Sequence, residues 1–351
     1  MKKRDVTMAL IGDTFVQRPD PDSAFAPALP IFKDADIVFC NLETVVADAK
    51  YLSPYDVDRR PRTDEAIFPA YLRAGINVMN VANNPGMYHG LDCFLRSLDV
   101  LDAAGVVYGG GGRNLAAARK PALIERNGTK IAFVCRASVC AVNAAATPQR
   151  PGIATFRIAT AYEARARINE VPGSPPIIHT LPNAQDIEAL QEDVHAARQQ
   201  ADVVVVSWHW GVSPATGGSG ELVGYQMAMG RAAIDFGADL VIGHHPHVLQ
   251  AIEVYRGKAI AYSLGNYVHD MKSSDDKGSK MDAMLLRCLV RDGKIQRLSF
   301  VPGRIDGHGP PNFFRPAEAP GVVQHMQQIS ERFGTRFEVG EEEVSVVLDA
   351  N

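Results

Sequence analysis

An α/β fold in one large domain is predicted by the regular alternation of strand-like and helix-like segments along the chain. Short apolar or β-branched runs that end in turn residues are typical of buried strands. Seven such runs occur, over residues 6–13, 35–43, 76–84, 129–135, 201–211, 238–247 and 258–266. Amphipathic stretches lie between them, notably at residues 90–104, 183–200 and 222–236. This alternation predicts layers of helices packed on sheets.

The strand assignments depend on the composition of each run and on the turn residues at its end. The first run, VTMALI, is apolar up to the turn pair Gly12-Asp13. In chain order, the runs DIVFC, INVMNV, TKIAFVC, ADVVVVSW, ADLVIG and KAIAYSL come after it. Gly or Asn lies at or just after the end of most of these runs, and both residues favour turns.

The composition is that of a globular protein with an extensive core. The chain has 351 residues, of which 46% are hydrophobic and 22% are charged, and these values exclude disordered, collagen-like and disulfide-scaffold proteins. Lys and Arg number 36 against 40 Asp and Glu, which gives a net charge of −4 without a long basic run. We therefore expect a small-molecule or peptide substrate as partner, and neither nucleic acid nor a membrane surface.

The cysteines and the first residues indicate the compartment. The five cysteines are scattered and mostly embedded in apolar runs, so we expect free, reduced thiols (Cys40, Cys93, Cys135, Cys140 and Cys288). The apolar stretch before Gly12 is too short for a signal peptide or a membrane span. These features predict a cytoplasmic protein, and they leave its oligomeric state open.

A boundary is predicted near residue 305. Residues 1–305 hold all the predicted strands and form the expected catalytic domain. The Gly- and Pro-rich stretch 302–320 interrupts this pattern, and an acidic tail comes after it. We expect residues 306–351 to form a C-terminal extension that packs on the catalytic domain.

Polar residues cluster directly after the predicted strands, and this placement is the main functional signal. Ligands gather at the carboxyl ends of strands in α/β sheets, where loops bring distant residues together. The segment Gly243-His244-His245-Pro246-His247 is the strongest single motif, because neutral imidazoles are common metal ligands. Clustered histidines can also be surface or hydrogen-bonded core residues. His209, at the end of another run, favours the metal interpretation.

Oxygen ligands for such a site are available on other predicted strands. Asp13 and Glu43 could hold two adjacent divalent cations, with one carboxylate bridging them. Asn84 could complete a coordination sphere through its amide oxygen. Individually, an Asp or Asn after a strand is more often a cap or turn residue, and Glu43 could be a solvated charge. The hypothesis of a metal site therefore rests on these residues occurring together with the histidines.

The ordered blocks IGD, CNLE, VANN, GGGGRNLAAARKP, SWHWG, GADLVIGHHPHVLQ and YSLGN span roughly residues 6–270. In these blocks the chain resembles the bacterial CapA-like family, named for capsule and poly-γ-glutamate synthesis. That family is in turn similar to the calcineurin-like metallophosphoesterases. The resemblance implies a layered α/β/β/α sandwich with a two-metal centre at the strand ends.

The resemblance also implies roles for individual residues. Glu43 falls in the block of the bridging carboxylate, and His244 is a candidate to support the ligands and act in catalysis. One or two divalent transition metal ions, Mn, Fe or Zn, are the implied cofactors. The implied metal ligands are Asp13, Glu43, Asn84, His209, His245 and His247.

Two departures from the pattern affect the expected chemistry. Phe15 replaces the histidine of an Asp-x-His motif, as is usual in this branch, so one metal is expected to bind weakly. Pro85 replaces the histidine that assists the leaving group in phosphoesterase relatives, and proline cannot carry a proton. His89 is the first candidate to replace this acid and His269 the second, and Tyr88 is also close in sequence. His89 could equally well be the start of a surface helix.

These features predict a metal-dependent hydrolase in which a metal-activated water attacks an amide, lactam or ester bond of a small carboxylate-bearing or peptide substrate. One alternative is an isomerase or epimerase that abstracts an α-proton, and another is a noncatalytic capsule-synthesis protein. A charged patch in a predicted loop could hold a substrate carboxylate, although we favour a solvated surface for it (Asp56, Asp58, Arg59, Arg60 and Arg62).

Overall fold

The fold is taken from a computed structural model. It describes residues 4–52, 61–165, 167, 170–214, 218, 220–270, 280–307 and 309–348. Four residues of the predicted charged patch lie outside these ranges (Asp56, Asp58, Arg59 and Arg60). Arg62 lies within them and donates a hydrogen bond to the carbonyl of Ala47 at 2.8 Å while pairing with Asp64.

The larger of two main sheets has ten strands, and β1 (Val6–Phe15) lies in its middle. On one side of β1 the strands are parallel, in the order β2 (Ile37–Leu42), β5 (Val78–Asn80) and β6 (Val107–Gly109). On the other side they are antiparallel, in the order β18 (Lys280–Arg291), β19 (Lys294–Asp306), β22 (Val344–Val346) and β21 (Phe337–Val339). Two short strands complete the sheet, β17 (Asn266–His269) parallel to β1 and β20 (Asn312–Phe313) beside β19.

The second sheet has six strands. Their order is β15 (Ile252–Tyr255), β16 (Lys258–Ala261), β14 (Leu240–His244), β13 (Val203–His209), β9 (Thr129–Ala137) and β8 (Ala122–Arg126). The four central strands of this order, β16 to β9, run parallel.

The two sheets pack face to face. Val203 and Val205 of β13 belong to the large core shared with the first sheet, whereas Val204 and Val206 belong to a second core with the helices outside. This alternation is expected of a strand buried on both faces. Phe39 of β2 and Phe133 of β9 stack across the interface with ring centroids 5.0 Å apart.

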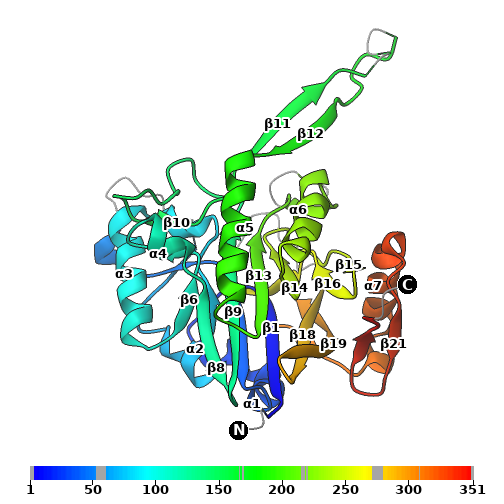
Figure 1. The fold of residues 1–351 in the computed structure, drawn as a ribbon. Coiled ribbons are helices and arrows are strands. Elements are labelled where there is room, and N and C mark those ends of the chain that lie inside the picture. Colours follow the sequence, from blue (N-terminus) through cyan, green and yellow to red (C-terminus); the bar gives the residue numbers. More distant parts are fainter. Residues whose placement is uncertain are drawn as a thin grey trace.

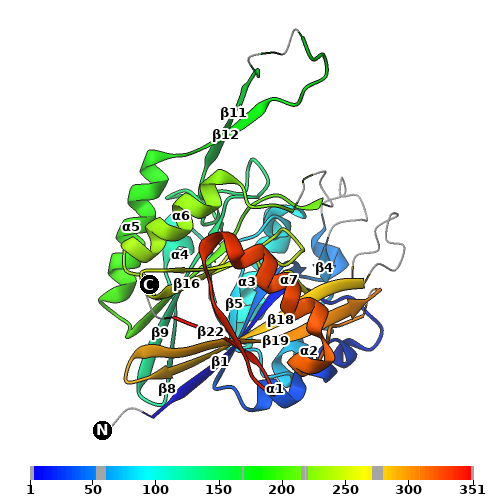
Figure 2. The same ribbon diagram turned by 90° about the vertical axis from the view of Figure 1, so that its right-hand side faces the viewer.

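Helices cover the outer faces, so the layers are helix, sheet, sheet and helix (Figures 1 and 2). Helices α5 (Ala184–Arg198) and α6 (Gly224–Asp235) pack on the second sheet and bury residues such as Val194 and Ala233. The other helices are α1 (Leu29–Lys33), α2 (Pro69–Arg73), α3 (Gly90–Ala103), α4 (Leu115–Arg119) and α7 (Pro320–Ser330). The α/β fold class predicted from the sequence is confirmed.

All the strands and helices predicted from the sequence are present. The seven predicted strands correspond to β1, β2, β5, β9, β13, β14 and β16, and the three predicted helices to α3, α5 and α6. The β18–β19 hairpin was not predicted. Residues after 306 add β20, β21 and β22 to the first sheet; the division of the chain at 305 stays a prediction.

A second unpredicted feature is an arm, formed by β11 (Ile158–Glu163) and β12 (Ile177–Pro182). The two strands pair antiparallel in a sheet of their own, and the arm projects from the body beyond α5 and α6 (Figures 1 and 2). None of the described helices is long and apolar enough to cross a membrane.

Candidate metal centre

Strand register brings the predicted ligands to one edge of the two sheets. Asp13 at the end of β1 is in register with Asn41 of β2 and Asn266 of β17. In the second sheet, His209 of β13 is in register with His244 of β14. Because these strands are parallel, their carboxyl ends meet at the same edge, as the sequence predicted.

Asp13 is held in place by backbone and side-chain donors. A Cβ at neighbouring Gly12 would lie 1.9 Å from the carbonyl oxygen of Gly265, so only glycine allows β1 to approach this loop. The buried Asp13 carboxylate accepts a hydrogen bond from Asn41 Nδ2 at 2.8 Å and from the backbone N–H of His245 at 3.0 Å. The carboxylate is therefore oriented before any ligand binds.

The histidine segment after β14 forms a turn with unusual backbone angles. His245 has a φ of 94° and His247 a φ of 60°, in the left-handed region that non-glycine residues rarely adopt. Such conformations cost on the order of 1–3 kcal/mol and concentrate at functional sites. The turn brings His247 Nδ1 to 3.3 Å from Asp13 Oδ2 and 2.8 Å from Asn266 Oδ1.

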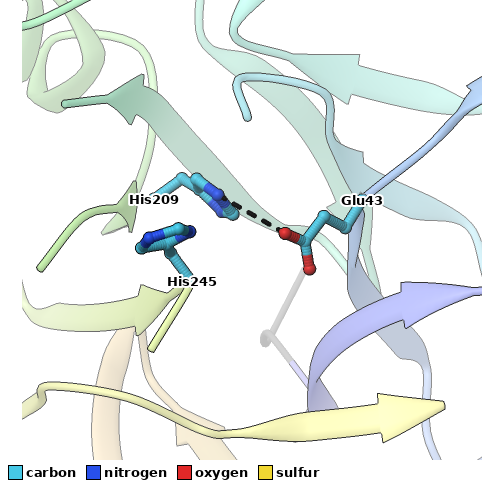
Figure 3. Close-up of side chains that lie close together, drawn as sticks. All are labelled: Glu43, His209 and His245. Atoms are coloured by element: carbon cyan, nitrogen blue, oxygen red, sulfur yellow. Dashed lines mark ion pairs between the residues drawn. The ribbon is translucent and has the colours of Figure 1, made fainter. Parts of the chain in front are cut away.

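Glu43 lies between two histidines. Its Oε1 is 3.7 Å from His209 Nε2, as Figure 3 shows, and 3.6 Å from His247 Nε2. His245 lies beside His209, with ring centroids 4.8 Å apart. The second oxygen of Glu43, Oε2, is buried and accepts no hydrogen bond from the described residues.

Two groups of side chains could each hold a metal ion, and Glu43 belongs to both. One group is Glu43, His209 and His245, and the other is Asp13, Glu43 and His247; within each group the ligand atoms lie within 4.8 Å of one another. A buried carboxylate oxygen of Glu43 and the buried Nδ1 of His245 have no hydrogen-bond partner in the described part of the chain, so two polar atoms are left for a ligand. Mixed oxygen and imidazole donors of this kind suit Mn, Fe or Zn.

Asn84 lies next to the first of these groups. Its Oδ1 is 2.7 Å from His209 Nε2, and its Nδ2 donates a hydrogen bond to the Tyr88 hydroxyl at 3.1 Å. The adjacent Pro85 begins a short 3₁₀ turn, η4 (Pro85–Met87), and is buried. Asn84 and His209 thus present two potential ligand atoms to the same space.

Asn41 is among the polar residues that come directly after the predicted strands, but the sequence assigned it no role at the site. Its Nδ2 contacts both Asp13 Oδ1 at 2.8 Å and His209 Nδ1 at 3.2 Å, and it is fully buried. Asn83 Nδ2 lies 3.4 Å from Asn41 Oδ1 and donates to the carbonyl of Leu42 at 2.7 Å. The available signal was its position two residues before Glu43 in the CNLE block.

The three candidate catalytic histidines occupy different positions. His244 is buried against Phe39, and its Nδ1 is 3.8 Å from Asp13 Oδ1. The His269 ring contacts the His247 ring, with centroids 5.2 Å apart. His89 is buried at the residue before α3. The catalytic roles of all three stay predictions.

The electrostatics favour a cation. Burial and the negative charge of Asp13 raise the pKa of Glu43. Burial lowers the pKa values of His244 and His245 to about 4, which keeps both imidazoles neutral and able to bind metal. Burial opposes protonation of His247, but Glu43 and Asp13 outweigh it and raise the His247 pKa to about 10. The carboxylates thus attract positive charge where an ion would lie.

The chain matches the family described as bacterial capsule synthesis protein PGA_cap over residues 5–271. It is 27% identical over 315 residues to the capsule biosynthesis protein CapA of Bacillus anthracis, covering 87% of this chain and 69% of the relative. It is 29% identical over 267 residues to the PGA biosynthesis protein CapA of Bacillus subtilis (strain 168), covering 76% of this chain and 62% of the relative. The chain thus spans less than two thirds of the B. subtilis protein.

Two further comparisons agree. A probable polyglutamine synthesis accessory protein of Mycobacterium tuberculosis is 28% identical over 315 residues, covering 86% of this chain and 74% of the relative. A hypothetical protein from Thermus thermophilus has the same fold, with a TM-score of 0.50 at 15% identity, covering 86% of this chain and 99% of that one. Because the family match covers most of the chain and includes every strand-end block of the centre, the chain belongs to the bacterial capsule synthesis protein family, PGA_cap.

Proposed function

We propose that the protein is a metal-dependent hydrolase whose centre takes two divalent transition metal ions. The observation that carries this proposal is that Glu43 belongs to both groups of potential ligands. We assign Asp13, Glu43 and His247 to one ion, and Glu43, His209, His245 and Asn84 to the other. When bound, the ions would polarise the scissile bond and lower the pKa of an attacking water.

The chain's own residues orient this centre. Asn41 donates to Asp13 and contacts His209, so it connects the two proposed ion positions. Asn266 contacts His247 Nδ1 at 2.8 Å and fixes the orientation of that ring. Contacts of this kind behind metal ligands commonly contribute about 10- to 100-fold to metal affinity or activity.

The proposed substrate is an amide, lactam or ester with a carboxylate nearby. By the resemblance to the phosphoesterases, Pro85 stands where a histidine assists the departure of the leaving group, and proline cannot donate a proton. Two relatives are named for the biosynthesis of PGA and for polyglutamine synthesis. A glutamate-based amide is consistent with both features and gives a specific substrate class to test.

Metal analysis of the purified protein, followed by assays with glutamyl peptides, pyroglutamyl lactam and p-nitrophenyl phosphate, tests this proposal. We expect close to two ions per chain and metal-dependent amine release from one of the carboxylate-bearing substrates. Glu43→Gln should abolish both, whereas Glu188→Gln, on the exposed face of α5, is the matched control. Metal-replete protein that releases no amine but rapidly cleaves the phosphoester would refute the substrate class.

A noncatalytic accessory role is the second candidate. It is favoured by the name of the Mycobacterium tuberculosis relative, a probable polyglutamine synthesis accessory protein. Protein that contains no metal when purified without chelator, and that binds none on titration with Mn²⁺ or Zn²⁺, would support this role over hydrolysis.

A further inference from the structure

The end of β13, which carries His209, is held by two residues from other elements. Tyr225 lies in the first turn of α6 and is 6% exposed, and its hydroxyl accepts a hydrogen bond from the backbone N–H of Gly211 at 2.6 Å. Ser138 comes directly after β9, and its backbone N–H donates to the carbonyl of His209 at 2.8 Å. The main chain is therefore bonded both at His209 and two residues after it.

The same two residues are joined through their side chains. The hydroxyl groups of Tyr225 and Ser138 are hydrogen-bonded to each other. Ser138 Oγ also accepts a hydrogen bond from Trp208 Nε1 at 2.9 Å. The residue before His209, His209 itself and Gly211 are thus connected to one pair of side chains. Because the bond to Gly211 is buried, loss of the Tyr225 hydroxyl would leave a buried N–H without its acceptor, which is costly.

The turn after β13 fits closely against α6. Gly211 has a φ of 83°, in the left-handed region that favours glycine. A Cβ at Gly211 would lie 2.9 Å from Gln226 Nε2, so the turn packs on the residue next to Tyr225. The Gln226 side chain is itself fixed, since its Oε1 accepts from the backbone N–H of Val223 and its Nε2 donates to Gln250 Oε1, both at 3.0 Å. The turn therefore lies between two immobilised side chains of α6.

The start of α6 is anchored on its other side, so Tyr225 is a fixed support. The backbone N–H of Tyr225 donates to Thr180 Oγ1 of the arm at 3.1 Å. The Tyr225 ring packs edge-on against Trp210, with ring centroids 6.5 Å apart, and Trp210 stacks on Trp208 with centroids 4.9 Å apart. The residues on both sides of His209 are therefore packed against the same support.

The His209 ring needs such a support because it reaches from the second sheet to residues of the first. Its Nδ1 is 3.2 Å from Asn41 Nδ2, and its Nε2 is 2.7 Å from Asn84 Oδ1 and 3.7 Å from Glu43 Oε1. Residues of a functional site must be held to within about 0.5 Å of their productive positions. A shift of the strand end would therefore separate His209 from the ligands on the other sheet.

We propose that Tyr225 is a positioning residue whose hydroxyl holds the end of β13 so that the His209 ring faces Glu43. The inference rests on the proposed function, since it concerns the ion that His209 would hold. A role limited to packing would require the ring of Tyr225 but not its hydroxyl. The two roles therefore differ in the expected effect of Tyr225→Phe, which removes the hydroxyl alone.

Calorimetric titration of the metal-free full chain with Mn²⁺ tests the proposal. His209→Ala identifies which binding step belongs to the ion at His209. We expect Tyr225→Phe to weaken that step by about 10-fold or more, as substitutions behind metal ligands do, and to leave the step that depends on His247 near its wild-type affinity. Unchanged affinity at the His209 step, or equal weakening of both steps, overturns the proposal.

Tyr262→Phe is the matched control. Tyr262 is also buried, its ring stacks on Trp210 with centroids 6.0 Å apart, and its hydroxyl donates to Glu253 Oε2 at 2.5 Å, so the variant loses a buried hydrogen bond next to the same tryptophan. A general loss of stability would affect both tyrosine variants alike. We expect the His209 step to be weakened in Tyr225→Phe only, and equal weakening in both variants contradicts a positioning role.

Ser138 provides a second pair of variants. Ser138→Ala removes the hydroxyl that joins Tyr225 to Trp208, and it should weaken the same binding step as Tyr225→Phe. Ser138→Thr keeps a hydroxyl at this position and should restore an affinity close to that of the wild type. If Ser138→Ala binds both ions as the wild type does, the network does not position His209.

The position of His209 can also be measured without metal, in a carbon–proton correlation spectrum of the histidine rings. The His209 signals are identified by their loss in His209→Ala. They should shift in Tyr225→Phe and stay in place in Tyr262→Phe. If His209→Ala binds metal as the wild type does, the proposed metal centre fails, whereas unshifted His209 signals in Tyr225→Phe overturn the positioning role itself.

Discussion

Asn84 Oδ1 and His209 Nε2 lie 2.7 Å apart, although 125 residues separate them in the chain. Each comes after or at the end of a strand in a different sheet, β5 for Asn84 and β13 for His209. The contact therefore lies across the edge where the two sheets meet. It explains why the centre combines an amide oxygen, carboxylates and imidazoles: the first sheet supplies oxygen ligands and the second supplies nitrogen ligands.

The shared position of Glu43 predicts which variants lose one ion and which lose both. His209→Ala and His247→Ala should each reduce metal content by about one ion per chain, because they belong to different groups. Glu43→Gln should reduce the content of both ions, since it belongs to both groups. Mass-spectrometric metal analysis after gel filtration measures this, and folding is checked by circular dichroism.

His325→Ala is the control for these variants. His325 lies on α7, away from the centre, and its hydrogen-bond partner within the described residues is Asp282. Full metal content in both His209→Ala and His247→Ala would show that the ligands are assigned wrongly.

Asn41 is predicted to support both ion positions. Asn41→Ala removes the donor to Asp13 Oδ1 and the contact with His209 Nδ1. A buried acceptor left without its donor costs about 1–3 kcal/mol, and we expect about 10- to 100-fold weaker Mn²⁺ binding by isothermal titration calorimetry. Asn77→Ala is the control, since Asn77 bonds to the backbone of Val38 and Asp36 instead. Equal affinities in the two variants would exclude this role for Asn41.

The parts of the fold that could be predicted are those with local signals. The core strands β1, β13 and β14 are continuous apolar runs, and the amphipathic spacing of α3 and α5 is visible within one window of sequence. The β18–β19 hairpin has a mixed composition, and its place beside β1 depends on pairing across almost the whole chain. Its assignment required long-range information.

The candidate site likewise contains residues that could be predicted from the sequence and residues that could not. Histidines and carboxylates after strands are recognisable by their chemistry, so the predicted ligands Glu43, His209 and His245 could be named from sequence alone. The role of Asn41 could not, because it depends on the register of β1 against β2 and on the distance between the two sheets. The left-handed conformation of His245 likewise has no local signal in the sequence, and its backbone N–H bonds to Asp13, 232 residues away in the chain.

Phosphoester hydrolysis is predicted to be poor. Pro85 begins the turn after Asn84 and offers no proton to a leaving group. With Mn²⁺ present, turnover of bis-p-nitrophenyl phosphate should stay near background, and Pro85→His should raise it by about 10-fold or more, within the range for general acid catalysis. Pro85→Ala controls for the loss of the ring. Rapid turnover by the wild type would refute this inference.

Gly243 is predicted to be essential for folding of the histidine turn. A Cβ there would lie 1.9 Å from the carbonyl oxygen of Tyr262 and 2.4 Å from Trp210 Nε1. Gly243→Ala should therefore lower the free energy of unfolding by about 3 kcal/mol or more, as overpacking against backbone does. Gly321→Ala, whose Cβ would approach only the Arg304 side chain at 3.7 Å, is the control in thermal denaturation. Similar Tm values would contradict the structural account of this turn.

The proton donor for an amine leaving group is predicted to be His89 or His269. Amide hydrolysis needs such a donor because an amine leaves poorly unless it is protonated, and a general acid contributes about two to four orders of magnitude. His89 is buried directly before α3, four residues beyond Pro85, and His269 contacts the His247 ring. If His89 is the acid, His89→Ala and His89→Gln should both lower kcat within that range while metal content stays near wild type. If both variants retain turnover, the same loss in His269→Gln would assign the role to His269. Loss of metal together with activity in His89→Ala would instead identify His89 as a ligand, because a proton donor is not needed to hold the ions.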